Sequence, residues 1–206
     1  DRIERIYNAG PLIVYPPVDA DFFSPGGEIK DYFLIVSALV PYKRVGLAVR
    51  TFSRLGLPLK VVGSGPERER LEALAGSNVE FIGWVSDEEL REYYRGCRAL
   101  IFPGEEDFGI VPLEAMACGR PVIGLEKGGL LETVVGLDRS DDTVPTGVFF
   151  SEPVEESLRE AVEKFIRRED LFDPGAIREH AAGFNRRRFK NEIKAAIDKI
   201  INEKNS

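Results

Sequence analysis

The chain is poor in several residue types that mark particular classes of protein. Its 206 residues include no glutamine, one methionine, one histidine and two cysteines. Cys97 and Cys118 stand far apart and form no C-x-x-C pair, which argues against a disulfide framework and against a zinc site. No stretch approaches the roughly 18 apolar residues that suggest a membrane-spanning helix. We therefore expect a protein of the reducing cytoplasm without a metal site.

The overall composition is that of an ordinary globular domain. Hydrophobic residues make up 43% of the chain and charged residues 31%, and a chain of this length can bury one sizeable core. The formal net charge of -7 creates no general attraction for polyanions. We therefore expect no nucleic-acid partner, and any phosphate must be bound by a local arrangement of residues.

The ends of the chain suggest one part of a longer protein. The first residue is Asp1 and the only methionine is Met116. Residues 2–7 have the pattern of a helix end, and a short strand is expected at Leu12–Tyr15 before the turn-rich Pro16–Asp19. We expect residues 1–10 to be the end of a preceding domain or a linker helix, residues 11–170 the main domain, and residues 171–206 C-terminal helices.

Short apolar runs alternate with helical patterns over most of the chain, which is the rhythm of repeated βαβ units. The runs are nearly continuous, as expected for strands covered by helices on both faces of a parallel sheet. We therefore predict an α/β fold with a Rossmann-like, doubly wound parallel sheet. The expected strands are Phe33–Val36, Leu59–Val62, Val79–Ile82, Ala99–Phe102 and Pro121–Ile123.

Helix signals between and after these runs are well formed. Ser86 and Glu89 have the spacing of a capping box, and Asp173 followed by Pro174 has the pattern of an N-cap and first helical residue. Three successive helical patterns without a strand between them predict an all-helical C-terminal tail. These patterns cover Ser151–Arg168, Asp173–Ala182 and Asn185–Glu203.

The loop and helix start around Gly109 carry the residues best suited to chemistry. Ligands of open parallel sheets bind at the carboxyl ends of the strands, where loops lead into helix N-termini. A glycine here allows an anion to approach the backbone, and the free N–H groups of Gly109, Ile110 and Val111 would face it with the helix dipole behind them. Pro112 suits the first helical position.

Two glutamates flank this helix start. Glu114, about one turn into the helix, can accept hydrogen bonds from the vicinal hydroxyls of a ribose, and Glu106 can do the same for a second sugar. A purely structural interpretation is that Glu114 caps the helix and Glu106 is a solvated loop charge. Spacing alone does not decide between these interpretations.

The whole segment, however, resembles glycosyltransferase family 4. Glu106 and Glu114 have seven residues between them, enclose Phe-Gly-Ile-Val-Pro-Leu and precede Ala-Met-Ala-Cys-Gly-Arg-Pro-Val-Ile. Further stretches match the family in order, so that the resemblance covers roughly residues 12–165. These are Val14–Asp19, Val40–Arg44, Val62–Pro66, Phe81–Val85, Lys127–Gly129 with Glu132–Val134, and Thr146–Val148.

The resemblance implies a retaining enzyme of the GT-B fold, in which two Rossmann-like domains enclose the active cleft. This chain is similar to the C-terminal half alone, so a preceding N-terminal domain is expected as its partner and this half alone is expected to be inactive. The implied catalytic residue is Glu106, which would contact the transferred sugar. The implied donor-binding residues are Lys43, Arg44, Gly83, Val85, Phe108, Gly109, Ile110, Val111 and Glu114.

The resemblance also assigns roles to these residues. Glu114 would bind the ribose, and the loop Gly83–Val85 would border the base. Lys43 would neutralise the diphosphate, so that no metal ion or other cofactor is implied. The family usually places an arginine on the diphosphate where this chain has Ala38, and the neighbouring Arg44 is a candidate substitute.

Four interpretations of function follow. The first is transfer of a hexose to a carbohydrate or lipid-linked acceptor. The Val-Pro-Tyr-Lys-Arg string is similar to mannosyltransferases of polysaccharide assembly, which favours GDP-mannose as donor. A UDP-sugar donor is the second, and a noncatalytic nucleotide-binding module is the third. A dinucleotide-dependent oxidoreductase is disfavoured, because Gly63-Ser64-Gly65-Pro66 lacks the third glycine of that fingerprint.

Several other residues invite a plainer interpretation. His180 is expected to be a surface histidine, and Trp84, Tyr93 and Tyr94 are expected to be packing aromatics. The basic run Arg186–Lys190 is expected to form a solvated face. Its alternatives are contact with the absent domain or peripheral contact with an anionic membrane, which would place the protein at the inner membrane surface.

Overall fold

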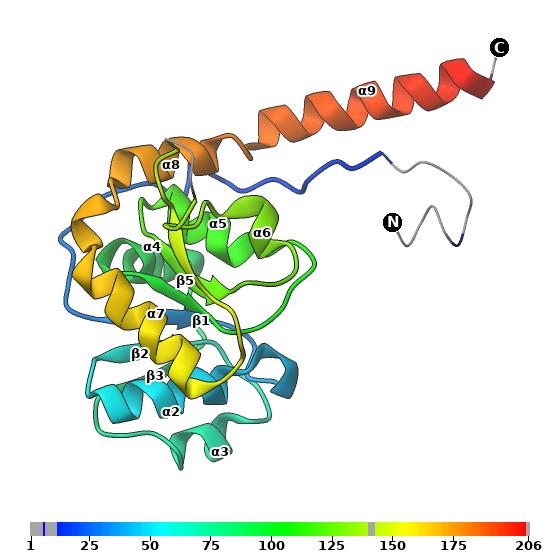
Figure 1. Ribbon diagram of the computed structural model, residues 1–206. Helices are drawn as coiled ribbons and strands as arrows, with labels where there is room; N and C mark the ends of the chain where they lie inside the picture. The colour runs from blue at the N-terminus through cyan, green and yellow to red at the C-terminus, as the bar shows by residue number, and fades with distance from the viewer. Residues whose placement is uncertain (1–5, 7–11, 140–142, 205–206) are drawn as a thin grey trace.

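The computed structural model describes residue 6 and residues 12–139 and 143–204 of the chain (Figure 1). The helix end expected at residues 2–7 therefore lies outside the described residues, apart from Ile6. Within the described residues, no helix is both long and apolar enough to cross a membrane.

A six-stranded parallel sheet forms the centre of the molecule, with the strand order β3-β2-β1-β4-β5-β6. The five predicted strands are confirmed to within a few residues at their ends. The sixth strand, β6, was not predicted, because its four residues follow a polar loop and begin with glycine. The strands are β1 (Phe33–Val36), β2 (Leu59–Val62), β3 (Val79–Gly83), β4 (Leu100–Phe102), β5 (Val122–Leu125) and β6 (Gly147–Phe150).

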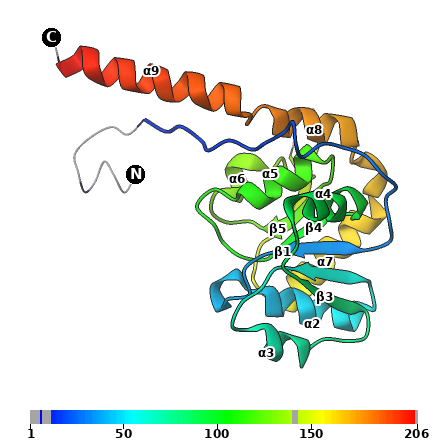
Figure 2. The ribbon, with the colours of Figure 1, turned by 180° about the vertical axis from the view of Figure 1, so that it is seen from behind.

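Helices cover both faces of the sheet, as a doubly wound fold requires (Figures 1 and 2). Helices α2 and α7 pack together on one face, while α4, α5, α6 and α8 form a connected layer on the other. The predicted fold class is confirmed. The helices are η1 (Pro41–Lys43), α2 (Val45–Leu55), α3 (Arg68–Glu72), α4 (Asp87–Gly96), α5 (Ile110–Ala117), α6 (Leu130–Thr133), α7 (Glu155–Arg167), η2 (Glu169–Leu171), α8 (Pro174–Ala182) and α9 (Arg186–Lys204).

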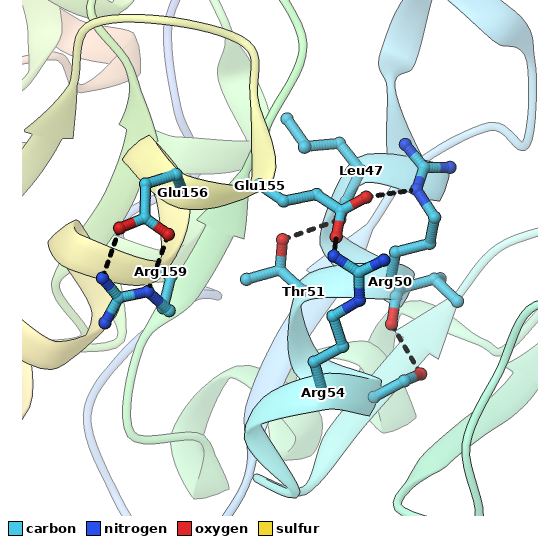
Figure 3. A network of polar contacts seen from close by, with 9 residues as sticks. Leu47, Arg50, Thr51, Arg54, Glu155, Glu156 and Arg159 are labelled. Atoms are coloured by element: carbon cyan, nitrogen blue, oxygen red, sulfur yellow. Dashed lines mark hydrogen bonds and ion pairs between the residues drawn. The ribbon is translucent and has the colours of Figure 1, made fainter.

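The core lies between the sheet and these two helix layers. Phe33 of β1 contacts Phe52 of α2 and Phe165 of α7, with ring centroids 5.1 and 5.9 Å apart. At the outer edge of the same interface, the Glu155 carboxylate accepts a hydrogen bond from Arg50 at 2.7 Å and forms an ion pair with Arg54 at 2.6 Å (Figure 3). These contacts fix α7 against α2 and thereby hold β6 at the edge of the sheet.

The predicted helix caps and the helical tail are confirmed. The Ser86 hydroxyl accepts a hydrogen bond from the Glu89 amide at 3.3 Å, and the Glu89 carboxylate accepts one from the Ser86 amide at 2.9 Å. The Asp173 carboxylate caps α8 by accepting from the Ala176 amide at 2.7 Å. After β6, the described residues contain only helices and their connections, and α9 extends away from the body of the domain (Figures 1 and 2).

The strand predicted at Leu12–Tyr15 is wrong. The described part of this segment has no strand partner and runs beside α9, where Leu12 and Val14 line a groove with Ile193 and Ile197 (Figure 1). An apolar run becomes a strand only when a neighbouring strand accepts its backbone hydrogen bonds. Among the described residues of the N-terminal segment, the one β-bridge is an isolated one from Val18 to Asn185.

Candidate functional site

The sheet has its topological switch point between β1 and β4. These strands are neighbours, yet the helices that follow them, α2 and α5, cover opposite faces of the sheet. The loops that leave their carboxyl ends therefore diverge and leave a crevice, which is where ligands of open α/β sheets bind. The predicted residues Lys43 and Arg44 follow β1, and the predicted residues from Glu106 onward follow β4.

The two diverging loops touch at Lys43 and Glu106. The Lys43 ammonium and the Glu106 carboxylate form an ion pair, in which the Lys43 Nζ lies against the buried Oε1 of Glu106. Burial lowers the pKa of the Lys43 ammonium, whereas the adjoining carboxylate acts in the opposite direction. The alternative interpretation of Glu106, as only a solvated loop charge, does not fit this ion pair.

Glycines let these loops approach one another closely. A Cβ atom on Gly104 would lie 3.1 Å from the Cα of Lys43, and one on Gly129 would lie 2.3 Å from the carbonyl oxygen of Asp107. The Gly129 amide donates a hydrogen bond to the Glu106 carbonyl at 2.8 Å. The loop that carries Glu106 is thus held between the β1 loop and the start of α6. The sequence showed Gly128-Gly129 only as a matching string and did not reveal this contact.

Helix α5 begins at the predicted place but not at the predicted residue. Gly109 is the N-cap with a φ of 84°, a left-handed conformation that favours glycine, and the first helical residue is Ile110. Pro112 therefore occupies the third helical position and not the first. Its missing N–H costs nothing, because the first helical amides have no partner inside the helix. No described residue accepts a backbone hydrogen bond from the amides of Gly109, Ile110 or Val111.

Glu114 is held by a buried tyrosine. The hydroxyl of Tyr94, on α4, donates a hydrogen bond to the Glu114 carboxylate at 2.8 Å, and Tyr94 is fully buried. Burial raises the pKa of Glu114 to about 7, against the opposing effect of the Tyr94 hydrogen bond. Because Glu114 is the fifth helical residue, it is too far along α5 for a capping box, which needs the third. Tyr94 was expected only to pack, so its second role was missed.

Arg44 has an unusual backbone conformation. Its φ of 53° makes it the only described residue other than glycine with a positive φ, at the joint between η1 and α2. Such a conformation costs about 1–3 kcal/mol and occurs often at functional sites. The buried Nη1 of Arg44 has no hydrogen-bond partner among the described residues. Ala38, where the resemblance implies an arginine, lies exposed on the same loop.

The loop expected to border a base ends β3. Gly83 has a φ of 91°, and the Arg68 side chain lies against it, 3.2 Å from where a Cβ would stand. Val85 is half-buried, but Trp84 is 80% exposed. The prediction that Trp84 is a packing aromatic is therefore wrong. An indole ring at the carboxyl edge of the sheet is accessible to a ligand.

Phe108 and the C-terminal residues also differ from their expected surroundings. The Phe108 ring, predicted only as part of the donor site, also stacks on Tyr15, with centroids 5.4 Å apart. His180 is not a free surface histidine, because its Nε2 is 2.8 Å from the Thr133 carbonyl oxygen. The basic run is only partly solvated. Arg186 pairs with Asp19 at 3.0 Å, and Arg188 donates to the Tyr15 carbonyl at 2.8 Å.

Two clefts of the described chain are lined by residues other than the predicted site residues. One of about 610 Å³ lies at the start of α9, and one of about 810 Å³ lies between Leu137 and Leu171. No group of three metal-ligating side chains is found among the described residues. The site therefore offers cations, backbone amides and carboxylates as its binding groups.

The raised pKa of Glu114 predicts a pH-dependent stability. Between pH 4.5, the ordinary pKa, and about 7, the folded protein binds more protons than the unfolded chain. Its free energy of unfolding should therefore fall as the pH rises through this window. At pH 8, Glu114→Gln should be more stable than the parent by about 1–3 kcal/mol, because it keeps an acceptor for Tyr94 without a buried charge. Urea unfolding of the parent and of Glu114→Gln at pH 5 and pH 8 measures this free energy. The prediction is contradicted if the two proteins differ in stability by the same amount at both pH values.

Comparison with known proteins identifies a family and several relatives of this chain. The family model described as glycosyl transferases group 1 matches residues 19–183. The D-inositol 3-phosphate glycosyltransferase of Mycobacteroides abscessus is 32% identical over 212 residues, which cover 90% of this chain and 46% of that protein. The O-antigen chain mannosyltransferase C of Escherichia coli is 34% identical over 105 residues, covering 48% of this chain and 28% of that protein.

A solved structure shows the same fold. Anabaena Alr3699/HepE in complex with UDP-glucose matches with a TM-score of 0.74 at 17% sequence identity, covering 91% of this chain and 57% of that one. The chain spans about half the length of the Mycobacteroides relative, of which it covers 46%.

Proposed function

The chain belongs to the glycosyl transferases group 1, and from that premise we propose that it is the donor-binding domain of a retaining hexosyltransferase of glycosyltransferase family 4. The sheet and its helices have the form of one Rossmann-like half of a GT-B enzyme. In this proposal a second domain of the same protein supplies the other wall of the cleft.

The observation that carries the proposal is the convergence of three kinds of group at the switch point. The Lys43 ammonium lies beside the Glu106 carboxylate. The partnerless amides of Gly109, Ile110 and Val111 begin α5. The Glu114 carboxylate, oriented by Tyr94, lies one turn further along the same helix. Cation and amides suit a diphosphate, and carboxylates suit sugar hydroxyls.

These residues would divide the work of transfer as follows. Glu114 accepts hydrogen bonds from the ribose hydroxyls and fixes the nucleoside. Lys43, with Arg44 in place of the arginine absent at position 38, neutralises the diphosphate. When the bond between the anomeric carbon and the phosphate oxygen breaks, negative charge grows on the leaving diphosphate, and fixed cations and amides stabilise it. Glu106 contacts the transferred hexose and keeps Lys43 beside it.

We propose GDP-mannose as the donor and a carbohydrate or lipid-linked molecule as the acceptor. Support comes from the Val-Pro-Tyr-Lys-Arg string at residues 40–44 and from the similarity to an O-antigen chain mannosyltransferase. A UDP-sugar is the alternative donor, supported by the solved relative in complex with UDP-glucose.

Titration with nucleoside diphosphates tests the proposal. Trp84 is the only tryptophan and lies exposed in the loop expected to border the base, so its fluorescence should change when a nucleotide binds. We expect GDP to bind more tightly than UDP or ADP, with calorimetry as the second measurement. No binding of any of the three at millimolar concentration would reject the donor site. Equal binding of all three would reject the preference for GDP.

A noncatalytic nucleotide-binding module is the second candidate, and Ala38 is the observation that favours it. Loss of a hydrogen bond to a charged group costs about 1.5–3 kcal/mol, so the missing arginine would lower donor affinity or rate about tenfold to a hundredfold. The encoding reading frame separates the candidates. A second Rossmann-like domain before Asp1 would favour the enzyme, and its absence would favour the module.

A further inference from the structure

A cluster of aromatic rings joins the donor loop to both ends of the domain. Tyr15 from the N-terminal segment stacks on Phe108, with ring planes inclined by only 18°. Phe184, between α8 and α9, contacts both rings, with centroids 6.2 Å from Tyr15 and 6.1 Å from Phe108. The His180 ring lies 5.9 Å from Phe184. Phe108 immediately precedes Gly109, the N-cap of α5, so this cluster adjoins the amides assigned to the diphosphate.

The same tyrosine also reaches the second loop of the site. The neighbouring Glu132 carboxylate, on α6, raises the pKa of the Tyr15 phenol. Helix α6 follows directly on Gly129, whose amide is bonded to the Glu106 carbonyl. Tyr15 therefore contacts the donor loop through its ring, and its phenol lies near the helix that supports this loop.

The segment that carries Tyr15 is itself anchored to the C-terminal helices. Arg188 donates hydrogen bonds to the carbonyl oxygens of Tyr15 at 2.8 Å and Pro16 at 3.4 Å. The Val18 amide donates to the Phe184 carbonyl at 2.9 Å. The N-terminal segment and the connection between α8 and α9 thus form one unit. Tyr15 is the residue of the N-terminal segment whose ring stacks on Phe108 of the donor loop.

We propose that Tyr15 is a positioning residue of the donor site. Its ring fixes Phe108 and with it the start of α5. Tyr15 need not touch the nucleotide. It acts by holding the loop of Glu106 and the amides of Gly109, Ile110 and Val111 in the arrangement that binds a diphosphate. This inference rests on the proposed function, but the ordering of the loop can be tested without a ligand.

The test without a ligand uses the Gly129 amide, which is bonded to the Glu106 carbonyl in the structure. Hydrogen exchange at this amide should be about two- to tenfold faster in Tyr15→Leu than in the parent, the effect expected from losing one aromatic pair. Tyr15→Phe keeps the ring but loses the hydroxyl. Its Gly129 amide should therefore exchange at a rate between those of the parent and Tyr15→Leu. An unchanged exchange rate in Tyr15→Leu would overturn the proposal.

The test with a ligand uses the affinity for GDP and UDP. Whichever the parent binds, Tyr15→Leu should bind about two- to tenfold more weakly, and Tyr15→Phe should recover most of the loss. Phe172→Leu is the control. It removes an aromatic contact to Phe165, whose ring centroid is 5.3 Å from that of Phe172, and neither residue belongs to the donor loops. It should lower the melting temperature yet leave nucleotide affinity and Gly129 exchange unchanged.

The two tests separate the two claims. If the parent binds no nucleotide, the proposed function fails, and Gly129 exchange still decides whether Tyr15 orders the loop. If the parent binds nucleotide and Tyr15→Leu binds it equally well, the positioning role fails while the proposed function stands. If Phe172→Leu weakens binding as much as Tyr15→Leu, the effect is one of general stability and the positioning role is rejected.

Discussion

Replacing Glu114 by alanine is expected to weaken nucleoside diphosphate binding about tenfold to a hundredfold, the range for a hydrogen bond to a charged group. The carboxylate lies one turn into α5, where Tyr94 orients it, and no second carboxylate was predicted for the ribose. Calorimetric titration of the variant and the parent with the same nucleotide measures the change. Parent-like affinity in Glu114→Ala would remove Glu114 from the site.

The pH dependence of binding provides an internal control for this prediction. Ribose hydroxyls donate to the ionised carboxylate, and burial raises the pKa of Glu114 to about 7. Affinity should therefore be highest above pH 7 and fall as the pH drops and the carboxyl group binds a proton. In Glu114→Gln this part of the pH dependence should disappear. A parent affinity that is constant from pH 5 to pH 8 would contradict the assignment.

Replacing Lys43 by alanine should also weaken binding of the diphosphate about tenfold to a hundredfold, because it removes the cation at the meeting point of the two loops. Lys43→Arg keeps the charge and should retain more of the affinity. The loss should shrink when the nucleoside diphosphate is replaced by the uncharged nucleoside, since only the phosphates need the cation. An equal loss with both ligands would indicate a structural role.

Glu106→Ala removes the other member of the ion pair that Lys43→Ala disrupts. Removing the carboxylate frees the Lys43 ammonium from its ion pair. Binding of the free nucleoside diphosphate should therefore be spared, while binding of the sugar nucleotide should weaken because Glu106 contacts the hexose. The reverse pattern, with nucleotide binding lost and sugar recognition kept, would exchange the roles proposed for Glu106 and Glu114.

Local sequence features correctly predicted the elements that depend on neighbouring residues. The buried runs at Phe33–Val36 and Leu59–Val62 are strands at the predicted bounds. The Ser86 capping box and the Asp173 cap form as expected. Each of these depends on apolar periodicity or on a bond spanning three residues, so a short window of sequence contains the cause.

Predictions failed where a distant partner decided the outcome. Leu12–Tyr15 is apolar, but it lies beside α9 and finds no strand to pair with. Trp84 is exposed because it follows the last residue of β3 at the edge of the sheet. Pro112 lies two positions deeper in α5 than predicted, since Gly109 takes up the left-handed turn before it.

For the candidate site, the sequence by itself determined the chemical groups and their order. The sequence itself contains a glycine before a helix start, two glutamates with seven residues between them, and a lysine after the first strand. Only the tertiary structure decided that Lys43 pairs with Glu106, that Tyr94 holds Glu114, and that Tyr15 stacks on Phe108. These contacts join residues from 20 to 93 positions apart, and packing of the sheet and helices brings them together in space. Ionisation and orientation depend on such neighbours, and no local pattern contains them.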